Sequence, residues 1–332
     1  MLFPSSLKRS ASGLVAVALI SFACSDAIGP ALAAVESVTA GNPISGLALY
    51  VDPSSSARQT ADAWRTSRPA DAAQMEKIAA ASQAMWFGGW SGDVRAAVDA
   101  AVSTAAATNA LPVLVAYNIP QRDCGSYSAG GSDSPDGYRA WISDFARGIA
   151  GRNAIVVLEP DALPGMDCLS ASDQQTRAGL LSHAIEKLKA LGATTVYLDA
   201  GHSRWHSPSE IAKRLNTAGI FAADGFSLNV SNFHLTSEQV SYGKSISDLI
   251  GGKHYIIDTS RNGLGAVSAE DWCNPAGRAL GERPTAATGH SLVDAFLWVK
   301  RPGESDGACN GHPAAGTWMP EYALGLAKRA SY

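Results

Sequence analysis

Short apolar runs alternate with amphipathic helical stretches along most of this chain, and the alternation constrains its fold more than any other feature. The apolar runs predict strands over residues 47–51, 84–87, 111–117, 154–158, 194–198, 225–230, 255–258 and 295–299. The stretches between them predict helices over about 57–81, 94–108, 138–150, 174–191, 207–218 and 322–330. Strands that alternate with helices form a parallel sheet covered on both faces.

Polar side chains follow the predicted strands at their carboxyl ends. The residues in these positions are Tyr117, Asp161, Asp199, Asn229, Asp258 and Lys300. A doubly wound sheet gathers such groups where its strand order reverses, whereas a barrel presents them around one mouth. We therefore expect an α/β fold of the (β/α) barrel type.

The stretch Leu158–Leu163 carries the clearest candidate chemistry. Glu159 and Asp161 directly follow the apolar run 154–158, and Pro160 between them ends the strand because it lacks a backbone N–H. A carboxylate at the end of a buried parallel strand is where an α/β barrel keeps its catalytic groups. Asp161 also suits the N-cap of a following helix, and this stretch alone does not choose between the two roles.

The chain has 332 residues and a formal charge of −4, which does not favour nucleic acid or an anionic membrane as partner. Its first 33 residues have the form of a secretory signal, with Lys8 and Arg9 before the apolar run 14–20 and a cleavage site at 31–33. The run is too short to span a bilayer. We expect a secreted protein with one domain over residues 34–332; lipid attachment at Cys24 is the alternative.

Four of the cysteines lie after the expected cleavage site, at Cys124, Cys168, Cys273 and Cys309. An even number in an exported chain indicates disulfides. No two of these cysteines have C-x-x-C spacing, so a zinc site is not expected, and no motif indicates another metal or a cofactor. Spacing alone leaves every pairing open.

Several motifs along the chain resemble glycoside hydrolase family 6, the cellulases that include endoglucanases and cellobiohydrolases. The first joins Tyr117, Pro120 and Arg122–Gly125 to a Gly-rich stretch, and the second is Val156–Leu163. Shorter matches lie at 85–89, 197–202, 229–232, 271–274 and 300–307. The resemblance covers nearly the whole chain after residue 33. It implies a distorted TIM-like barrel with about seven strands instead of eight, with its site at their C-terminal ends.

The resemblance assigns the chemistry to acidic residues. It implies that Asp161 is the general acid, that Asp123 raises the pKa of this acid, and that Asp306 is the base, acting directly or through a second water. Two carboxylates in one site do not ionise together easily, so one stays protonated near neutral pH. Tyr117 is implied to press on the sugar beside the cleaved bond.

The resemblance also implies a set of sugar-binding residues. The rings of Trp86, Trp205 and Trp272 are expected to stack on glucose units. Polar contacts to the sugar are expected from Asp199, His202, Asn229, Asn232, Lys300, Glu304 and Ser128, with Ala129 as the alternative to Ser128 in the flap. The other tryptophans, Trp64, Trp90, Trp141, Trp298 and Trp318, are interpreted as packing residues.

The family pattern further implies the pairing of the cysteines. Cys124 is expected to join Cys168, and Cys273 to join Cys309, so that each bond ties a loop with a catalytic acid. Arg301 departs from the pattern, because Pro or Gly is expected before Pro302.

These observations predict a secreted, monomeric, endo-acting β-1,4-glucanase that cleaves cellulose and cello-oligosaccharides with inversion and needs no cofactor or protein partner. Endo action is expected because the loops look too short to roof a cleft. The alternatives are an exo-acting cellobiohydrolase and a glycan-binding protein that has lost catalysis. Retention of Asp123, Asp161 and Asp306 argues against the last, because a pure binder needs no acid with a raised pKa.

Overall fold

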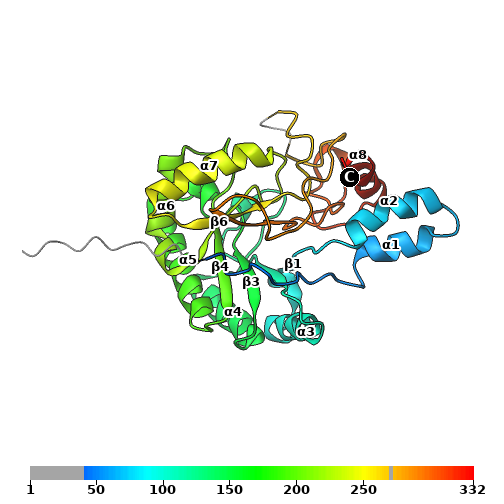
Figure 1. Cartoon of the computed structure of the whole chain (residues 1–332). Coiled ribbons are helices and arrows are strands. Elements are labelled where there is room, and N and C mark those ends of the chain that lie inside the picture. Colours follow the sequence, from blue (N-terminus) through cyan, green and yellow to red (C-terminus); the bar gives the residue numbers. More distant parts are fainter. Residues whose placement is uncertain (1–40, 269–271) are drawn as a thin grey trace, which may run out of the picture. The chain divides into compact units, whose positions relative to one another are not determined.

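The fold, seen in a computed structural model that describes residues 41–268 and 272–332, is a curled sheet of parallel strands surrounded by helices (Figure 1). The seven strands are hydrogen-bonded in sequence order. They are β1 (Met85–Phe87), β2 (Val113–Ala116), β3 (Ala154–Leu158), β4 (Thr194–Asp199), β5 (Gly225–Leu228), β6 (His254–Asp258) and β7 (Val293–Leu297). This confirms the predicted (β/α) barrel architecture. The expected signal at 1–33 and Cys24 lie outside the described residues.

The outer face of the sheet is covered by the helices that connect consecutive strands, which are α3 (Val94–Ala107), α4 (Pro135–Ile149), α5 (Ala171–Lys189), α6 (Pro208–Thr217) and α7 (Thr236–Leu249). The other helices are α1 (Ser56–Trp64), α2 (Pro69–Ala79) and α8 (Pro320–Arg329). Local sequence sets their starts. The side chains of Asp93, Ser134 and Ser207, for example, each accept a backbone N–H from the first turn of α3, α4 and α6.

Alternation along the strands divides the apolar residues between two cores. Val113, Val115 and Ile155 point into the barrel with Val157, Tyr197 and Leu297. Residues one position away, such as Leu114 and Val156, point outward against α3, α4 and α5. Because side chains of a strand alternate between its faces, runs that are apolar at every position fit a sheet buried on both sides.

The structure differs from the predicted elements in three places. The predicted helix 57–81 is two helices, because Pro69 starts α2 and disfavours a helical conformation at the residue before it. The predicted strand 47–51 is reduced to one parallel bridge between Leu49 and Leu111. Helix α7 was not predicted. Its sequence is polar on average, and its buried residues include Gln239 and Ser247.

The edge strands β1 and β7 are joined by side chains and loops. The backbone N–H of Ala84 donates to the carbonyl of Trp298 at 2.9 Å, and the Trp86 indole N–H donates to Val299 at 2.8 Å. Arg301 spans this seam, with Nε 3.0 Å from the carbonyl of Ala84. The residue that departs from the family pattern therefore has a structural role here.

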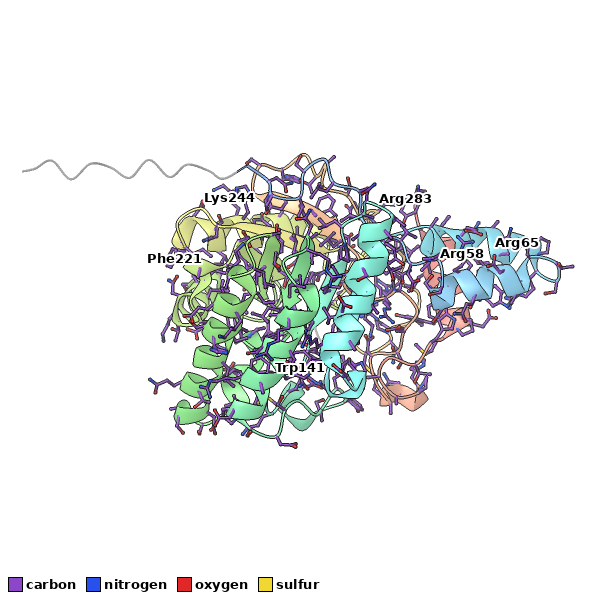
Figure 2. All side chains as sticks on the ribbon, turned by 90° about the horizontal axis from the view of Figure 1, so that it is seen from below. Arg58, Arg65, Trp141, Phe221, Lys244 and Arg283 are labelled. Atoms are coloured by element: carbon purple, nitrogen blue, oxygen red, sulfur yellow. A yellow bond between two sulfur atoms is a disulfide. The ribbon has the colours of Figure 1, made fainter. Side chains whose placement is uncertain are left out.

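Helices α1, α2 and α8 form a separate apolar cluster beside the barrel (Figure 1). Figure 2 shows Arg58 and Arg65 on the α1–α2 hairpin, with Trp141 on α4 in the barrel's helical layer. Within residues 41–268 and 272–332, no helix combines the length and apolar character needed to cross a membrane.

Candidate active site

A groove of about 990 Å³ lies at the carboxyl ends of the strands. The four predicted catalytic residues, Tyr117, Asp123, Asp161 and Asp306, all line it. So do the predicted sugar-binding residues Trp86, Ser128, His202, Trp205, Asn232, Trp272, Lys300 and Glu304, together with Ala129. Parallel strands bring their carboxyl ends to one edge, so residues far apart in sequence converge there.

Asp161 lies in a tight turn after β3. Its φ of 66° and the φ of 47° at Glu159 are unusual for residues with side chains, so the turn holds Asp161 in a strained conformation. Its backbone N–H donates to Asp199 at 3.0 Å. Helix α5 is capped by Ser170, which excludes the helix-cap role for Asp161.

The electrostatic surroundings of Asp161 favour its protonated form. Burial raises the pKa of its carboxyl well above the ordinary value, and the nearby carboxylates of Asp199, Asp123 and Asp306 raise it further. Lys300 opposes this shift only in part. A carboxyl with such surroundings can hold a proton that it delivers to a bound molecule.

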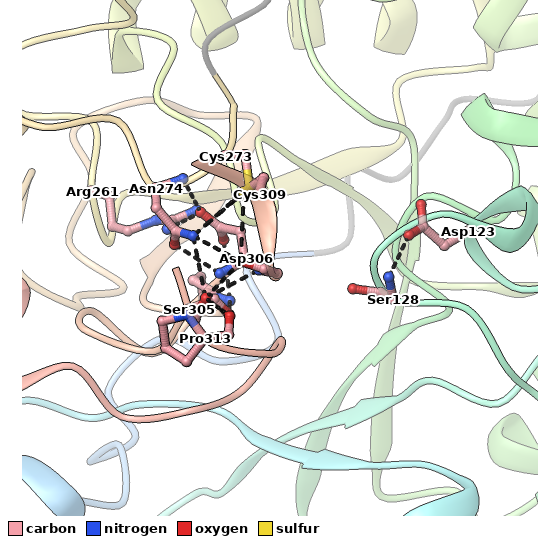
Figure 3. Close-up of a disulfide and its surroundings, with 11 residues drawn as sticks. Asp123, Ser128, Arg261, Cys273, Asn274, Ser305, Asp306, Cys309 and Pro313 are labelled. Atoms are coloured by element: carbon pink, nitrogen blue, oxygen red, sulfur yellow. Dashed lines mark hydrogen bonds and ion pairs between the residues drawn. A yellow bond between two sulfur atoms is a disulfide. The ribbon is translucent and has the colours of Figure 1, made fainter. Parts of the chain in front are cut away.

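Asp306 has the opposite environment (Figure 3). Arg261 Nη1 lies 2.8 Å from one carboxylate oxygen, and Lys300 Nζ lies 3.2 Å from the other. Burial alone would raise the pKa of Asp306, but the charges of Arg261 and Lys300, with hydrogen bonds from Arg261 and from the backbone of Asn274, lower it below the ordinary value. Asp306 is therefore an anion that faces the groove.

Asn274 holds the segment that carries Asp306 (Figure 3). Its backbone N–H donates to the Asp306 carboxylate at 2.9 Å, and its side-chain oxygen accepts the Asp306 backbone N–H at 2.8 Å. Its side-chain nitrogen donates to Ser305 Oγ and to the carbonyl of Gly307, both at 3.2 Å. The adjoining Cys273–Cys309 disulfide, predicted from the family pattern, ties both segments together.

Asp123 belongs to a flap on another side of the groove (Figure 3). Its carboxylate accepts the backbone N–H of Ser128 at 2.7 Å, and burial raises its pKa. The second predicted disulfide, Cys124–Cys168, ties the flap to the loop after Asp161. Asp123 and Asp306 are thus each placed by a nearby disulfide and by a hydrogen bond from the backbone.

The side chain of Arg122 organises the flap. Its guanidinium donates to the carbonyls of Tyr117, Ser128 and Ala129 at 2.7 to 3.0 Å. It also lies between two rings, 4.4 Å from the centroid of Tyr117 and 5.1 Å from that of Trp90. Arg122 therefore connects the flap to the wall of the groove.

Asp199 and Asn229 have different positions from those predicted. Both are fully buried, and neither lines the groove. Asp199 accepts the N–H groups of Asp161 and Gly201, and its pKa is raised by burial to about 7. Asn229 hydrogen-bonds to His234 and to the carbonyl of Asp258. In this structure both support loops beneath the groove, which corrects the expectation that they contact the sugar.

Buried carboxylates at other strand ends connect loops in the same way. Glu159 accepts the N–H groups of Asn118 and Ile119 at 2.9 to 3.0 Å, and burial raises its pKa to about 7. Asp258 accepts those of Ser231 and Lys300. These acids fix the backbone around the groove and do not reach it themselves.

His202 stays neutral in the wall of the groove. Burial, together with the neighbouring ring of His234 at 4.3 Å between centroids, lowers its pKa to about 3. A neutral imidazole can accept as well as donate a hydrogen bond, which suits contact with a hydroxyl. Tyr117 and Trp86 meet edge to face at 5.2 Å nearby.

Sequence reasoning missed several residues of the site. Trp90 was interpreted as a packing residue, but it is 57% exposed and lines the groove. Arg261 was not singled out, because a lone arginine in a loop has no recognisable pattern. Asn274 was part of a matched motif, and its position beside Trp272 and a cysteine was the only signal available. Within the part of the chain that the structure describes, no cluster of His, Cys, Asp or Glu could hold a metal ion.

A parallel barrel that opens an aromatic-lined groove over several carboxylates has the architecture of the barrel-type glycoside hydrolases. Comparison with known families makes this specific: the family described as glycosyl hydrolases family 6 matches residues 44–330, and the chain belongs to it.

Curated relatives support this placement. Endoglucanase A of Cellulomonas fimi is 48% identical over 293 residues, which are 87% of this chain and 62% of that protein. Endoglucanase 1 of Streptomyces halstedii is 42% identical over 83% of this chain and 87% of its own length. The chain thus spans less than two thirds of the Cellulomonas relative.

A solved structure agrees in fold. The endoglucanase Cel6 from Mycobacterium tuberculosis, in complex with a methyl-cellobiosyl thio-cellobioside, superposes with a TM-score of 0.83 at 46% identity, over 86% of this chain and 98% of that one.

Proposed function

We propose that this chain is an endo-acting β-1,4-glucanase that inverts the anomeric centre. The observation that carries the proposal is the opposite surroundings of two carboxyls in one groove, because Asp161 lies buried near other carboxylates and Asp306 pairs with Arg261 and Lys300. The pKa of Asp161 is raised and that of Asp306 is lowered, so an acid and a base face the same space. Environments that separate two carboxyl pKa values assign the acid and the base.

The reaction follows from this arrangement. Asp161 donates its proton to the glycosidic oxygen as the bond from that oxygen to the anomeric carbon breaks. A water molecule attacks the anomeric carbon from the opposite face, and its proton passes to Asp306 directly or through a second water. A single displacement inverts the configuration, and inverting enzymes separate their carboxyl groups by about 6.5–9.5 Å to admit the water.

The other groove residues would bind the glucan. Trp86, Trp205 and Trp272 offer flat rings to the C–H faces of glucose. Ser128, His202, Asn232, Lys300 and Glu304 offer hydrogen bonds to hydroxyls, with Tyr117 against the sugar beside the cleaved bond. Asp123 would act on Asp161 through its charge.

Endo action has support from the relatives and from the groove wall. Curated relatives named endoglucanase are 41–48% identical to the chain, and curated relatives named exoglucanase or cellobiohydrolase are 26–30% identical. The solved endoglucanase CEL6B from Humicola insolens, at 28% identity, shows that lower identity does not itself mean exo action. The lining of the groove includes the small residues Ala314, Ala315 and Gly316. Loss of viscosity of a soluble cellulose derivative, measured against released reducing ends, tests this. An early fall in viscosity is expected, and a fall only in proportion to reducing ends would indicate exo action.

Proton NMR of a cello-oligosaccharide digest tests the mechanism. The α-anomer should appear first, before mutarotation. A β-anomer first would mean a covalent intermediate, so the roles of the carboxyls would be wrong. Asp161→Asn should retain binding and lower turnover by about 10²–10⁴-fold. Normal turnover by this variant would remove Asp161 as the acid.

We also propose that the chain is exported and that its mature domain is 34–332. The form of the first 33 residues and the two disulfides of the described domain support this. Mass spectrometry of the exported protein should find an N-terminus at residue 34. An N-terminal lipid on Cys24 would support anchoring instead.

A further inference from the structure

We infer that Trp90 is an additional stacking platform for glucose in the groove, a role that rests on the proposed function. Its side chain lines the groove and is 57% exposed, more than any other tryptophan among the exposed residues, since Trp205 is 37% and Trp272 is 40% exposed. By contrast, the packing residue Trp298 is 1% exposed. Core packing does not account for this position, and ligand sites are characteristically lined by aromatic side chains.

The ring is held in place from behind. A Cβ added at Gly88 would come within 2.4 Å of the indole atom Cζ3, so the ring occupies the space that glycine leaves open. Gly88 has an extended conformation with φ −157°, which any residue adopts, so glycine is needed for the ring and not for the backbone. The ring therefore lies against the backbone of its own loop.

The Arg122 guanidinium provides a second support, 5.1 Å from the indole centroid. Arg122 is 7% exposed and is itself hydrogen-bonded to the carbonyls of Tyr117, Ser128 and Ala129. A cation over an aromatic ring is attracted to its face. Supported in this way, the indole loses little conformational freedom when a ligand binds, which favours binding.

The ligand chemistry follows from the exposed indole. A β-1,4-linked glucose unit has C–H groups on its faces and hydroxyls at its edges, so a flat apolar ring matches its face. Trp86, four residues earlier in strand β1, also lines the groove. Trp90 would therefore hold a further unit of an unbranched glucan and favour longer chains over shorter ones.

The test compares Trp90→Ala, Gly88→Ala and the control Phe221→Ala on the series from cellotriose to cellohexaose. The Gly88 variant keeps the indole but displaces it, so both groove variants should behave alike. We expect kcat/KM for cellohexaose to fall about tenfold, equivalent to about 1.4 kcal/mol, with cellotriose changed less than about twofold. Phe221, which is 63% exposed and does not line the groove, should have no effect when it is replaced.

Calorimetric binding of cellohexaose in the Asp161→Asn background separates the possible failures. Weaker binding after Trp90→Ala supports the platform. If Trp90→Ala matches the protein with Trp90 intact in binding and in kcat/KM for every chain length, the platform is overturned. A loss of kcat that is the same for every chain length would also overturn it, because Trp90 would then support the flap through Arg122. If the protein with Trp90 intact binds no cello-oligosaccharide, the proposed function itself fails, and the platform fails with it.

Discussion

Replacing Asn274 by alanine should disable the base more than it unfolds the protein. The side chain of Asn274 accepts the backbone N–H of Asp306 and donates to Ser305 and Gly307. Asn310 provides a matched control, because it also follows a cysteine of the same disulfide and has φ 53°, against 49° for Asn274. Asn310 is exposed, and within the described chain it makes no hydrogen bond to Asp306.

The expected losses of stability and of kcat follow from the interactions that each variant removes. Alanine at either position should destabilise by about 1–2 kcal/mol, because both keep a left-handed backbone conformation that alanine disfavours. Only Asn274→Ala also leaves the buried N–H of Asp306 without its acceptor, which costs about 1–3 kcal/mol more. Because small misplacements of a catalytic group can lower a rate by about 10²-fold, we expect a kcat loss of that order with little change in KM.

The pH dependence gives the sharper readout. Activity requires the Asp306 carboxylate to be ionised, and Arg261 and Lys300 keep its pKa below the ordinary value. If the carboxylate moves away from these cations, its pKa rises towards the ordinary value. The acid limb of the kcat profile should then shift to higher pH in Asn274→Ala and remain in place in Asn310→Ala.

A double-mutant cycle with Asp306→Asn tests whether Asn274 acts through Asp306. The additional loss from Asn274→Ala should vanish in the Asp306→Asn background, because residues that act as a unit are not additive. Urea titration measures the unfolding free energy of each variant. Equal kcat and pH profiles for the two asparagine variants would refute the reasoning, as would full additivity with Asp306→Asn.

Asp199→Asn should shift the basic limb of the kcat profile to lower pH, because it removes a negative charge that raises the pKa of Asp161, which must stay protonated; an unchanged basic limb would contradict this. Gly131→Ala should nearly abolish activity, since φ is 99° there and a Cβ would come within 1.8 Å of the Ile119 carbonyl oxygen; activity near that of the unmodified protein would show that the flap is not required. Removing either disulfide by serine substitution should lower stability by a similar amount, about 2–4 kcal/mol in urea titration, because the bridged separations of 44 and 36 residues are similar. A large difference between the two would point to strain or denatured-state structure.

Much of the site was predictable from strand ends. Tyr117, Asp161 and Lys300 follow runs that are plainly strands, and parallel pairing brings such positions to one edge. Asp199 shows where this reasoning fails. An acid after a strand can face the groove or accept backbone N–H groups beneath it, and both placements leave the same sequence pattern. Only the position of the neighbouring loop decides between them.

Trp90 shows the same limit for aromatic residues. A tryptophan after two glycines is compatible with burial or exposure, and the outcome depended on Gly88 and Arg122 behind the ring. Helix α7 was missed for a related reason. Its buried face contains Ser247 and Gln239, and the side chain of Gln239 finds its hydrogen-bond partner in Ser203, far away in the sequence.

The sequence by itself determined the alternation of strands and helices and, with it, the barrel class, because hydrophobic periodicity is a local property of the chain. The tertiary structure alone decided which carboxyl is protonated and which is charged. The pKa of Asp161 depends on burial beside other carboxylates, and that of Asp306 depends on Arg261 and Lys300. Electrostatic interactions act through space, between groups that the chain brings together only when it folds.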